Sequence, residues 1–191
     1  MAPTRANHYT VDSTSGRLSP ARQLVSPNQD ARPGDARPEL IVLHGISLPP
    51  GEFGGPAIEQ LFMNRLDCDA HPYYGGIRGM RVSAHLLIRR DGGVLQFVPF
   101  GARAWHAGSS RFRGRSRCND FSIGIELEGS DDRPYADRQY EELVPIIRSI
   151  RAAYPAITSR HLAGHCDVSP GRKSDPGPAF DWLRLYDALA A

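Results

Sequence analysis

The chain contains 191 residues with a formal net charge of +2, and 40% of them are hydrophobic and 23% charged. This length is enough for one domain with its own core, and the charge is too small to indicate nucleic-acid binding by itself. No apolar run is long enough to cross a membrane, and the polar residues 1–24 lack the apolar core of a secretory signal. We therefore expect neither a nucleic-acid nor a membrane partner.

The cysteine content indicates a compartment. Cys68, Cys118 and Cys166 are odd in number and scattered along the chain. Free thiols in a reducing environment are the simplest interpretation of that pattern. Together with the missing signal segment, it predicts a cytoplasmic protein.

The first half of the chain predicts one buried strand and one short helix. Residues 1–37 are rich in Ser, Pro, Arg and Asp, and we expect them to be irregular or loose. The continuous apolar run at 39–47 is typical of a buried strand, and 56–64 has the pattern of a short helix that starts at a proline. The Gly- and Pro-containing segments 48–55 and 65–80 are expected to be loops.

The middle of the chain predicts three further strands and a long helix. Residues 81–100 indicate two strands joined at Asp91-Gly92, a good hairpin signal. Residues 101–120 are expected to be a loop, and 121–129 alternate as a strand does. The helical periodicity of 137–154 contains Pro145, which should kink the helix or mark its first turn.

The C-terminal segment predicts a strand over 158–165 and a last helix capped by Asp181. The order of strands and helices indicates an α/β protein, with a mixed central sheet and helices packed on it.

One loop carries a concentration of reactive side chains. His165, Lys173 and Asp175 lie within eleven positions, separated by prolines and glycines that favour a stiff, turned loop. Histidine and aspartate can bind a metal, and a lysine beside them can stabilise an anion. These residues therefore indicate part of a site.

Other histidines leave alternatives open. His44 ends an apolar strand, where a sheet presents functional groups, but a buried structural histidine is the alternative. His161 lies four residues before His165. About 13 Å of extended chain would separate the two residues, which is too far for both to bind one zinc ion. We therefore take His165 as the ligand, leave His161 to packing or the surface, and expect Cys166 to be a buried thiol.

Two further groups have functional and structural interpretations. His85 is expected to be a buried structural histidine. One interpretation of Trp105 and His106 is that they line a ligand cleft. The alternative is that Trp105 belongs to the core. The arginines of 111–117 form a solvated basic loop or an anion-binding lip. Arginine suits substrate carboxylates, which draws attention to Arg117 and also Arg81.

Glu126 and Glu128 share one face of the predicted strand at 121–129. A solvated strand face is one interpretation. The neighbours of Glu126 in the sequence argue against that interpretation, because they are apolar residues and glycine. Such surroundings would raise the pKa of Glu126 and make it suitable as a general base.

Four segments together resemble a known family. IVLHGISLPPGEFGGP, RVSAHLLIRRDG, VPFGARAWHAGSSRFRGRSRCNDFSIGIELEG and HLAGHCDVSPGRKSDPGPAFDW are similar to the zinc N-acetylmuramoyl-L-alanine amidases. Within these they resemble the 1,6-anhydro-N-acetylmuramyl-L-alanine amidases of Gram-negative bacteria. The resemblance implies a peptidoglycan-recognition-protein-like fold, with 18–191 as a single zinc amidase domain. It leaves 1–17 as an irregular N-terminal extension.

The resemblance also implies roles for individual residues. His44, His165 and Asp175 would bind one Zn²⁺ per chain and leave a fourth coordination position open, the pattern of a catalytic site. Glu126 would accept the proton of the attacking water, and Lys173 would hold the oxyanion.

The implied substrate is a small cytoplasmic anhydromuropeptide, cut between the lactyl group and L-alanine during peptidoglycan recycling. Arg81 and Arg117 would contact peptide carboxylates and Trp105 would line the cleft, whereas Gly45 stands where the family has asparagine. We expect a monomer. The alternatives are an amidase acting on intact cell wall and a non-catalytic peptidoglycan-binding module.

Overall fold

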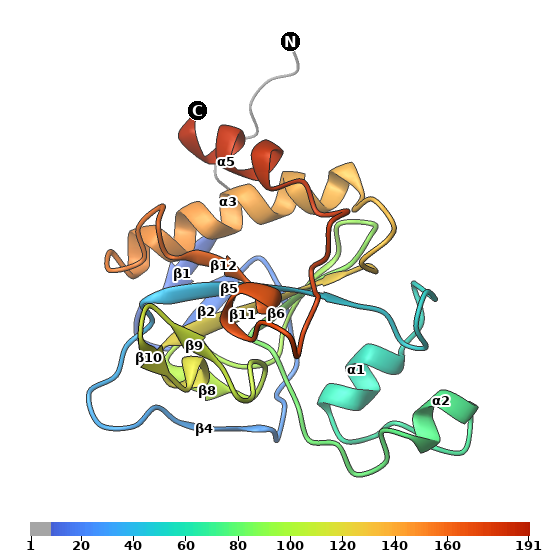
Figure 1. Cartoon of the computed structure of the whole chain (residues 1–191). Helices are drawn as coiled ribbons and strands as arrows, with labels where there is room; N and C mark the ends of the chain where they lie inside the picture. The colour runs from blue at the N-terminus through green and yellow to red at the C-terminus, as the bar shows by residue number, and fades with distance from the viewer. Residues whose placement is uncertain (1–8) are drawn as a thin grey trace.

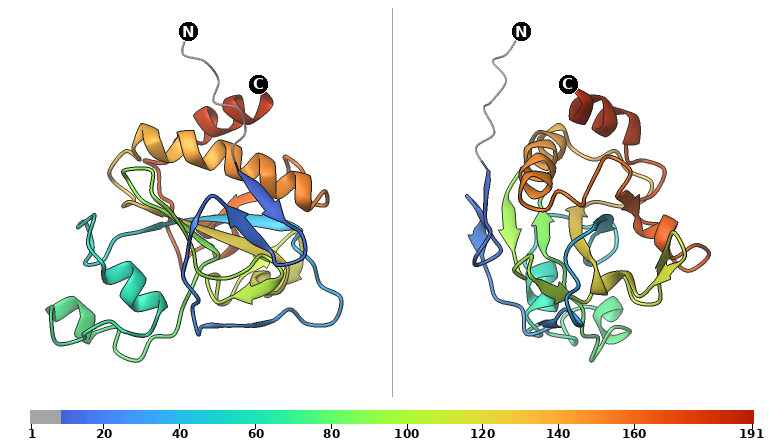
Figure 2. Two further views of the ribbon diagram at one scale, coloured as in Figure 1. Left: turned by 180° about the vertical axis from the view of Figure 1, so that it is seen from behind. Right: turned by 90° about the vertical axis from the view of Figure 1, so that its left-hand side faces the viewer.

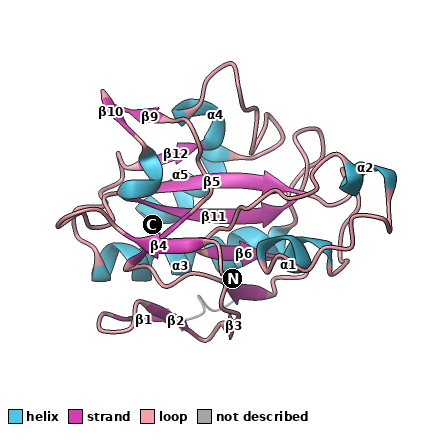
Figure 3. Cartoon of the chain, turned by 90° about the horizontal axis from the view of Figure 1, so that it is seen from below, coloured by secondary structure: helices cyan, strands magenta, loops and turns pink. Residues whose placement is uncertain are grey.

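The centre of the fold is a six-stranded sheet, seen in a computed structural model that describes residues 9–191. All neighbouring strands are parallel except the hairpin partners β6 and β7. Figure 3 shows β5 and β11 running side by side, with α2 beyond their arrowheads. The expected mixed α/β sheet is confirmed. Its strand order is β12 (Leu162–Gly164), β5 (Leu40–Ile46), β11 (Ser122–Glu128), β6 (Leu86–Ile88), β7 (Val94–Gln96) and β3 (Arg22–Gln23).

The two longest strands, β5 and β11, occupy the middle of the sheet, and both were predicted. Each is covered on both faces, which explains the near-continuous apolar run of β5. On β11, Ile123, Ile125 and Leu127 join the main core, so the alternate residues face the other side. The parallel register pairs His44 with Glu126. The two side chains therefore emerge from neighbouring strands on the same face.

One face of the sheet is covered by α3 (Asp137–Ala153), and α5 (Trp182–Ala190) lies next to α3 (Figures 1 and 2). Leu143, Ile147 and Ile150 of α3 are fully buried against the sheet, as the helical periodicity predicts. Asp181 caps α5 by accepting a hydrogen bond from the main-chain nitrogen of Arg184.

Pro145 corrects one expectation, because it lies in the interior of α3 and not in its first turn. Its missing N–H leaves only the carbonyl of Glu141 without a helical donor. Glu141 is solvent-exposed, so water can satisfy that carbonyl and the helix continues.

The opposite face of the sheet is covered by short elements and loops. A second apolar cluster holds α1 (Ala57–Phe62) against the sheet, and a third lies around η1 (Cys118–Asp120) and α4 (His165–Val168). The helix predicted at 56–64 is confirmed by α1, and the hairpin predicted within 81–100 is confirmed by the antiparallel pair β6 and β7. The segment expected to be a loop at 65–80 contains one helical turn, α2 (Pro72–Gly75). The ring nitrogen Nδ1 of His71 caps it by accepting from the main chain of Tyr73.

The N-terminal region is more ordered than its composition predicts. Tyr9 and Leu18 are buried in the main core, although their segment was expected to be irregular. The polar composition of this segment predicted an irregular structure, because composition does not reveal which of its few apolar residues are buried in the core. The extension expected at 1–17 therefore contains strand from residue 10, and residues 1–8 lie outside the described part. The short strands are β1 (Thr10–Asp12), β2 (Arg17–Ser19) and β4 (Gln29–Ala31), which pairs with β8 (Ala102–Ala104).

The loop expected at 101–120 likewise contains β8, η1 and a small hairpin of β9 (Arg111–Phe112) and β10 (Arg115–Ser116). Among the described residues, no helix combines the length and the apolar character needed to cross a membrane.

Candidate functional site

Three predicted residues converge at one point. The Nδ1 atoms of His44 and His165 are 3.0 Å apart, and they lie 3.2 Å and 3.0 Å from Oδ2 of Asp175. Ligands around one tetrahedral zinc are about 3.4 Å apart when Zn–N is near 2.1 Å. The triangle of two nitrogens and one carboxylate oxygen therefore fits a single metal ion.

Local structure explains how the chain brings these groups together. His44 is near the end of β5, and the parallel neighbour β12 leads directly into His165. The main-chain nitrogen of Cys166 donates to the carbonyl of Asp175 at 2.9 Å, which closes the Pro-Gly loop on itself. The stiff loop predicted from its prolines and glycines thus returns Asp175 to His165.

The predicted strand over 158–165 is shorter than expected, because it begins only at Leu162 and His165 already belongs to α4. The main-chain nitrogen of Gly164 donates to Oδ2 of Asp167 at 2.7 Å, which stabilises this helical turn. Cys166 therefore lies on a helix and is half-exposed, so the expectation of a buried thiol was wrong. His161 lies apart from the metal triangle and accepts from the main chain of Thr158.

Electrostatics favour metal binding at this point. Burial lowers the pKa of His44 to about 4, so its ring is neutral at physiological pH, which is the form that binds metals. Burial alone would raise the pKa of Asp175, but its contacts with His165 and His44 outweigh that effect and hold the pKa below its ordinary value. Two histidine nitrogens and one carboxylate suit zinc.

Glu126 is the register partner of His44 on the neighbouring strand β11. It is 8% exposed, and its Oε2 has no hydrogen-bond partner in the described part of the chain. Burial, and then the charge of Asp175, raise its pKa well above the ordinary value, and Lys173 opposes the shift. A buried carboxyl group with an unused oxygen is able to take up or release a proton.

Glu128 has a different environment on the same face of β11. It accepts hydrogen bonds from the main chain of Gly54 and Arg90 and from the guanidinium of Arg89. The alternative of a solvated glutamate face was wrong for both residues, because both are buried. Only Glu126 faces the cavity.

A cavity of about 580 Å³ opens over the metal triangle. Lys173 and Arg172 line it and are exposed. The lining residues from the segment between α1 and β6 are mostly apolar and include Tyr73 and Met80, both exposed by nearly half. The cavity thus combines cationic and apolar lining residues.

The other predicted substrate contacts lie next to this cavity. Arg81 lines a smaller pocket of about 170 Å³ that shares Met80 with it. Arg117 lines a basic pocket of about 420 Å³ that shares Arg172, and it pairs with Asp120 at 3.1 Å. Trp105 is half-buried. None of the three is among the described residues that line the main cavity.

Sequence reasoning missed several residues that support the site. Tyr135 donates a hydrogen bond to the carbonyl of Pro176, next to Asp175. The glycines at 45 and 129 leave the room for Tyr135, and these glycines were the only available signal. His85 is buried as expected, with Nδ1 accepting from the main chain of Gly124.

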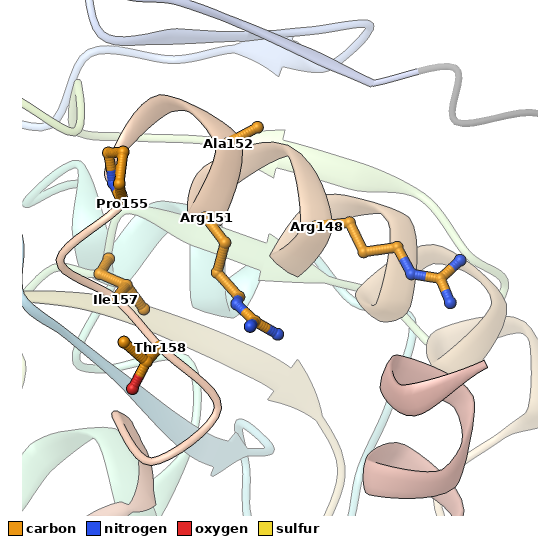
Figure 4. Close-up of a pocket in the computed structure, with 6 residues that line it drawn as sticks. All are labelled: Arg148, Arg151, Ala152, Pro155, Ile157 and Thr158. Atoms are coloured by element: carbon orange, nitrogen blue, oxygen red, sulfur yellow. The ribbon is translucent and has the colours of Figure 1, made fainter.

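A separate pocket lies at the C-terminal end of α3 (Figure 4). Figure 4 shows Arg148 and Arg151 extending in different directions from the helix, and Arg148 donates to the carbonyl of Ala188. The two guanidinium groups do not converge, so this pocket provides no anion site.

Comparisons with known proteins agree with the geometry. The family described as N-acetylmuramoyl-L-alanine amidase (Amidase_2) matches residues 34–178. The 1,6-anhydro-N-acetylmuramyl-L-alanine amidase AmpD of Salmonella typhimurium LT2 is 57% identical over 176 residues, 92% of this chain and 93% of that protein. A crystal structure of an AmpD derivative superposes with a TM-score of 0.89 at 55% identity, covering 92% of this chain and 97% of that one.

A second solved structure includes a ligand. Pseudomonas aeruginosa AmpDh3, crystallised in complex with anhydromuramic pentapeptide, is 30% identical with a TM-score of 0.58. The match covers 83% of this chain and 62% of that chain.

Proposed function

The chain belongs to the N-acetylmuramoyl-L-alanine amidase family, and we propose that it cleaves the amide bond between the lactyl group of 1,6-anhydro-N-acetylmuramic acid and L-alanine. The products are an anhydromuramyl sugar and a peptide that begins with L-alanine, which places the reaction in peptidoglycan recycling. One observation carries this proposal. A three-residue metal site and an unpartnered buried carboxyl group line the same cavity.

The proposed cofactor is one Zn²⁺ per chain, held by His44, His165 and Asp175. When bound, zinc supplies a Lewis acid that polarises the amide carbonyl and lowers the pKa of a water ligand to about 7. The near-equilateral spacing of the three ligand atoms and the neutrality of His44 support this assignment.

Glu126 is the proposed general base and acid. Its unpaired Oε2 is free to accept the proton of the attacking water and then to deliver it to the departing amine of L-alanine. A cation between the metal ligands would draw its raised pKa back down, toward the range in which a carboxylate is a useful base at neutral pH.

Lys173 is the proposed anion stabiliser. Lys173 lines the cavity, and its charge opposes the raised pKa of Glu126, which supports a role beside the reacting centre. A fixed cation at this position would stabilise the negative charge that develops on the carbonyl oxygen.

The remaining assignments concern the substrate. Arg117 and Arg81, in the pockets beside the cavity, would bind peptide carboxylates, and Trp105 would add an apolar contact to the substrate. The metal triangle, Glu126 and Lys173 line one cavity of a single chain, so the proposed site needs no residue from a second copy, which supports a monomer. The free cysteines support a cytoplasmic setting.

Mass spectrometry of the products tests the proposal. Purified protein is incubated with a soluble anhydromuropeptide or with intact sacculi, each with and without a chelator and with zinc added back. We expect free peptide from the soluble substrate, loss of product with chelator and recovery with zinc. Preferential release from sacculi would favour a cell-wall amidase, whereas binding without any product would identify a non-catalytic module.

A further inference from the structure

The outer ring nitrogen, Nε2, of each histidine ligand lies within hydrogen-bond distance of one of two consecutive residues, His106 and Ala107. Nε2 of His44 lies 2.9 Å from Nδ1 of His106, and Nε2 of His165 lies 3.3 Å from the carbonyl oxygen of Ala107. In a neutral imidazole one nitrogen carries the proton and the other a lone pair. A proton held at Nε2 leaves Nδ1 bare, and the two Nδ1 atoms are those that meet at Asp175.

The ring of His106 is itself oriented by its surroundings. Its Nε2 lies 3.1 Å from the hydroxyl of Ser122, which can accept the proton of that nitrogen and in that tautomer leaves Nδ1 to accept from His44. The ring is buried and lies directly over Gly124 of β11, where an added Cβ would come within 2.5 Å of it. Only glycine leaves room for this arrangement.

The segment of His106 and Ala107 is held by a side chain from η1. Oδ1 of Asn119 accepts hydrogen bonds from the main-chain nitrogens of His106 at 3.2 Å and Ala107 at 2.8 Å. The carbonyl of Asn119 accepts in turn from the buried guanidinium of Arg32. Two successive peptide groups are thus fixed by one amide oxygen.

We propose that His106 is a positioning residue, which fixes the tautomer of His44 so that its Nδ1 lone pair faces the metal position, and that Asn119 acts through it. Ala107 provides the matching acceptor for His165. This inference rests on the metal site of the proposed function. A residue that merely filled space would leave both ring nitrogens of His106 without specific partners, whereas each has one.

Zinc affinity tests the role of His106. His106→Leu fills a similar volume without an acceptor, whereas His106→Asn places an amide oxygen near the position of Nδ1. Competition with a chromophoric chelator should show zinc binding weakened about 10- to 100-fold in His106→Leu and largely restored in His106→Asn. His161→Leu removes a histidine outside the site and should bind zinc as the unsubstituted protein does.

The tautomer of His44 gives a second test that needs neither catalysis nor a variant. Two-bond ¹H–¹⁵N correlation spectra of the zinc-free protein should show the His44 proton on Nε2. A proton on Nδ1, or unchanged zinc affinity in His106→Leu, would overturn the proposal. If the unsubstituted protein fails to bind zinc while His44 keeps its Nε2 proton, the metal assignment fails and the positioning role stands.

Discussion

Glu126 and Glu128 stand two residues apart on one face of β11, yet their hydrogen bonding differs completely. Glu128 is saturated by Gly54, Arg89 and Arg90, whereas Oε2 of Glu126 has no partner among the described residues. The sequence alternation predicted their common face, and the apolar neighbours of Glu126 predicted its raised pKa. The sequence does not distinguish a structural carboxylate from a reactive one, because the partners of Glu128 come from distant segments.

Replacing Glu126 by glutamine should remove activity without removing the metal. Glutamine keeps the shape of the side chain but cannot accept the proton, so we expect kcat to fall about 10²- to 10⁴-fold. Zinc content by atomic emission should remain near one per chain. Near-normal turnover in Glu126→Gln would eliminate the general-base role.

The same substitution should change stability in the zinc-free protein. The pKa of Glu126 is raised in the folded state, so its contribution is fully present below the unfolded value near 4.5 and is lost as pH rises toward the folded value. Glu126→Gln should therefore be more stable than the unsubstituted protein at pH 7, and equally stable near pH 4. Urea unfolding at both pH values measures this difference.

Glu128→Gln is the matched control for that measurement. It removes a charged acceptor from the largely buried Arg89 and should lower the free energy of unfolding by about 1–3 kcal/mol at pH 7. If both substitutions destabilise the zinc-free protein equally, the contrast between the two carboxyl groups is wrong.

At the scale of elements, the sequence predicted the strands and the helix that are buried along most of their length. It did not predict the elements that form because of single side-chain contacts. β5, β11 and α3 have long apolar patterns that no other element type explains. β1 and α2 depend on isolated contacts, such as the cap provided by His71, which have no periodic signal. The metal triangle was predicted through the family resemblance, whereas the supporting residues were not.

Tyr135 shows how two strand ends support the site through one side chain. Its ring lies against Gly129 after β11, and its hydroxyl fills the space beside Gly45 on β5 while donating to Pro176 at 2.9 Å. Gly45 stands where the family that the sequence resembles has asparagine. The structure adds that this glycine leaves room for a hydroxyl group that holds the residue after Asp175.

Gly45→Ala should therefore weaken zinc binding, because its methyl group overlaps with the Tyr135 hydroxyl and must displace it from Pro176. We expect zinc affinity, measured by chelator competition, to fall about tenfold. Tyr135→Phe removes the hydroxyl and should relieve the overlap. The double variant should bind zinc no more weakly than Tyr135→Phe alone, and additive losses would contradict this coupling.

At the scale of the whole molecule, the metal ligands connect parts of the chain that are far apart in sequence. His44 belongs to the central strand β5, whereas His165 and Asp175 belong to the segment that leads to α5. An ion bound to all three exists only in the folded state, so zinc should stabilise the whole domain. The free energy of unfolding should increase by about 4 kcal/mol when the concentration of free zinc is 1,000 times its Kd.

For a domain of this length, such a stabilisation should raise Tm by roughly 8–16 °C, at about 2–4 °C per kcal/mol. Differential scanning calorimetry with chelator and with a zinc series measures it, and the rise should continue with the logarithm of zinc concentration after the site is full. His165→Ala should lose this dependence because the remaining two ligands bind zinc weakly. A Tm that chelator does not change, or a zinc response that survives in His165→Ala, would mean that the ion binds elsewhere or binds the unfolded chain equally well.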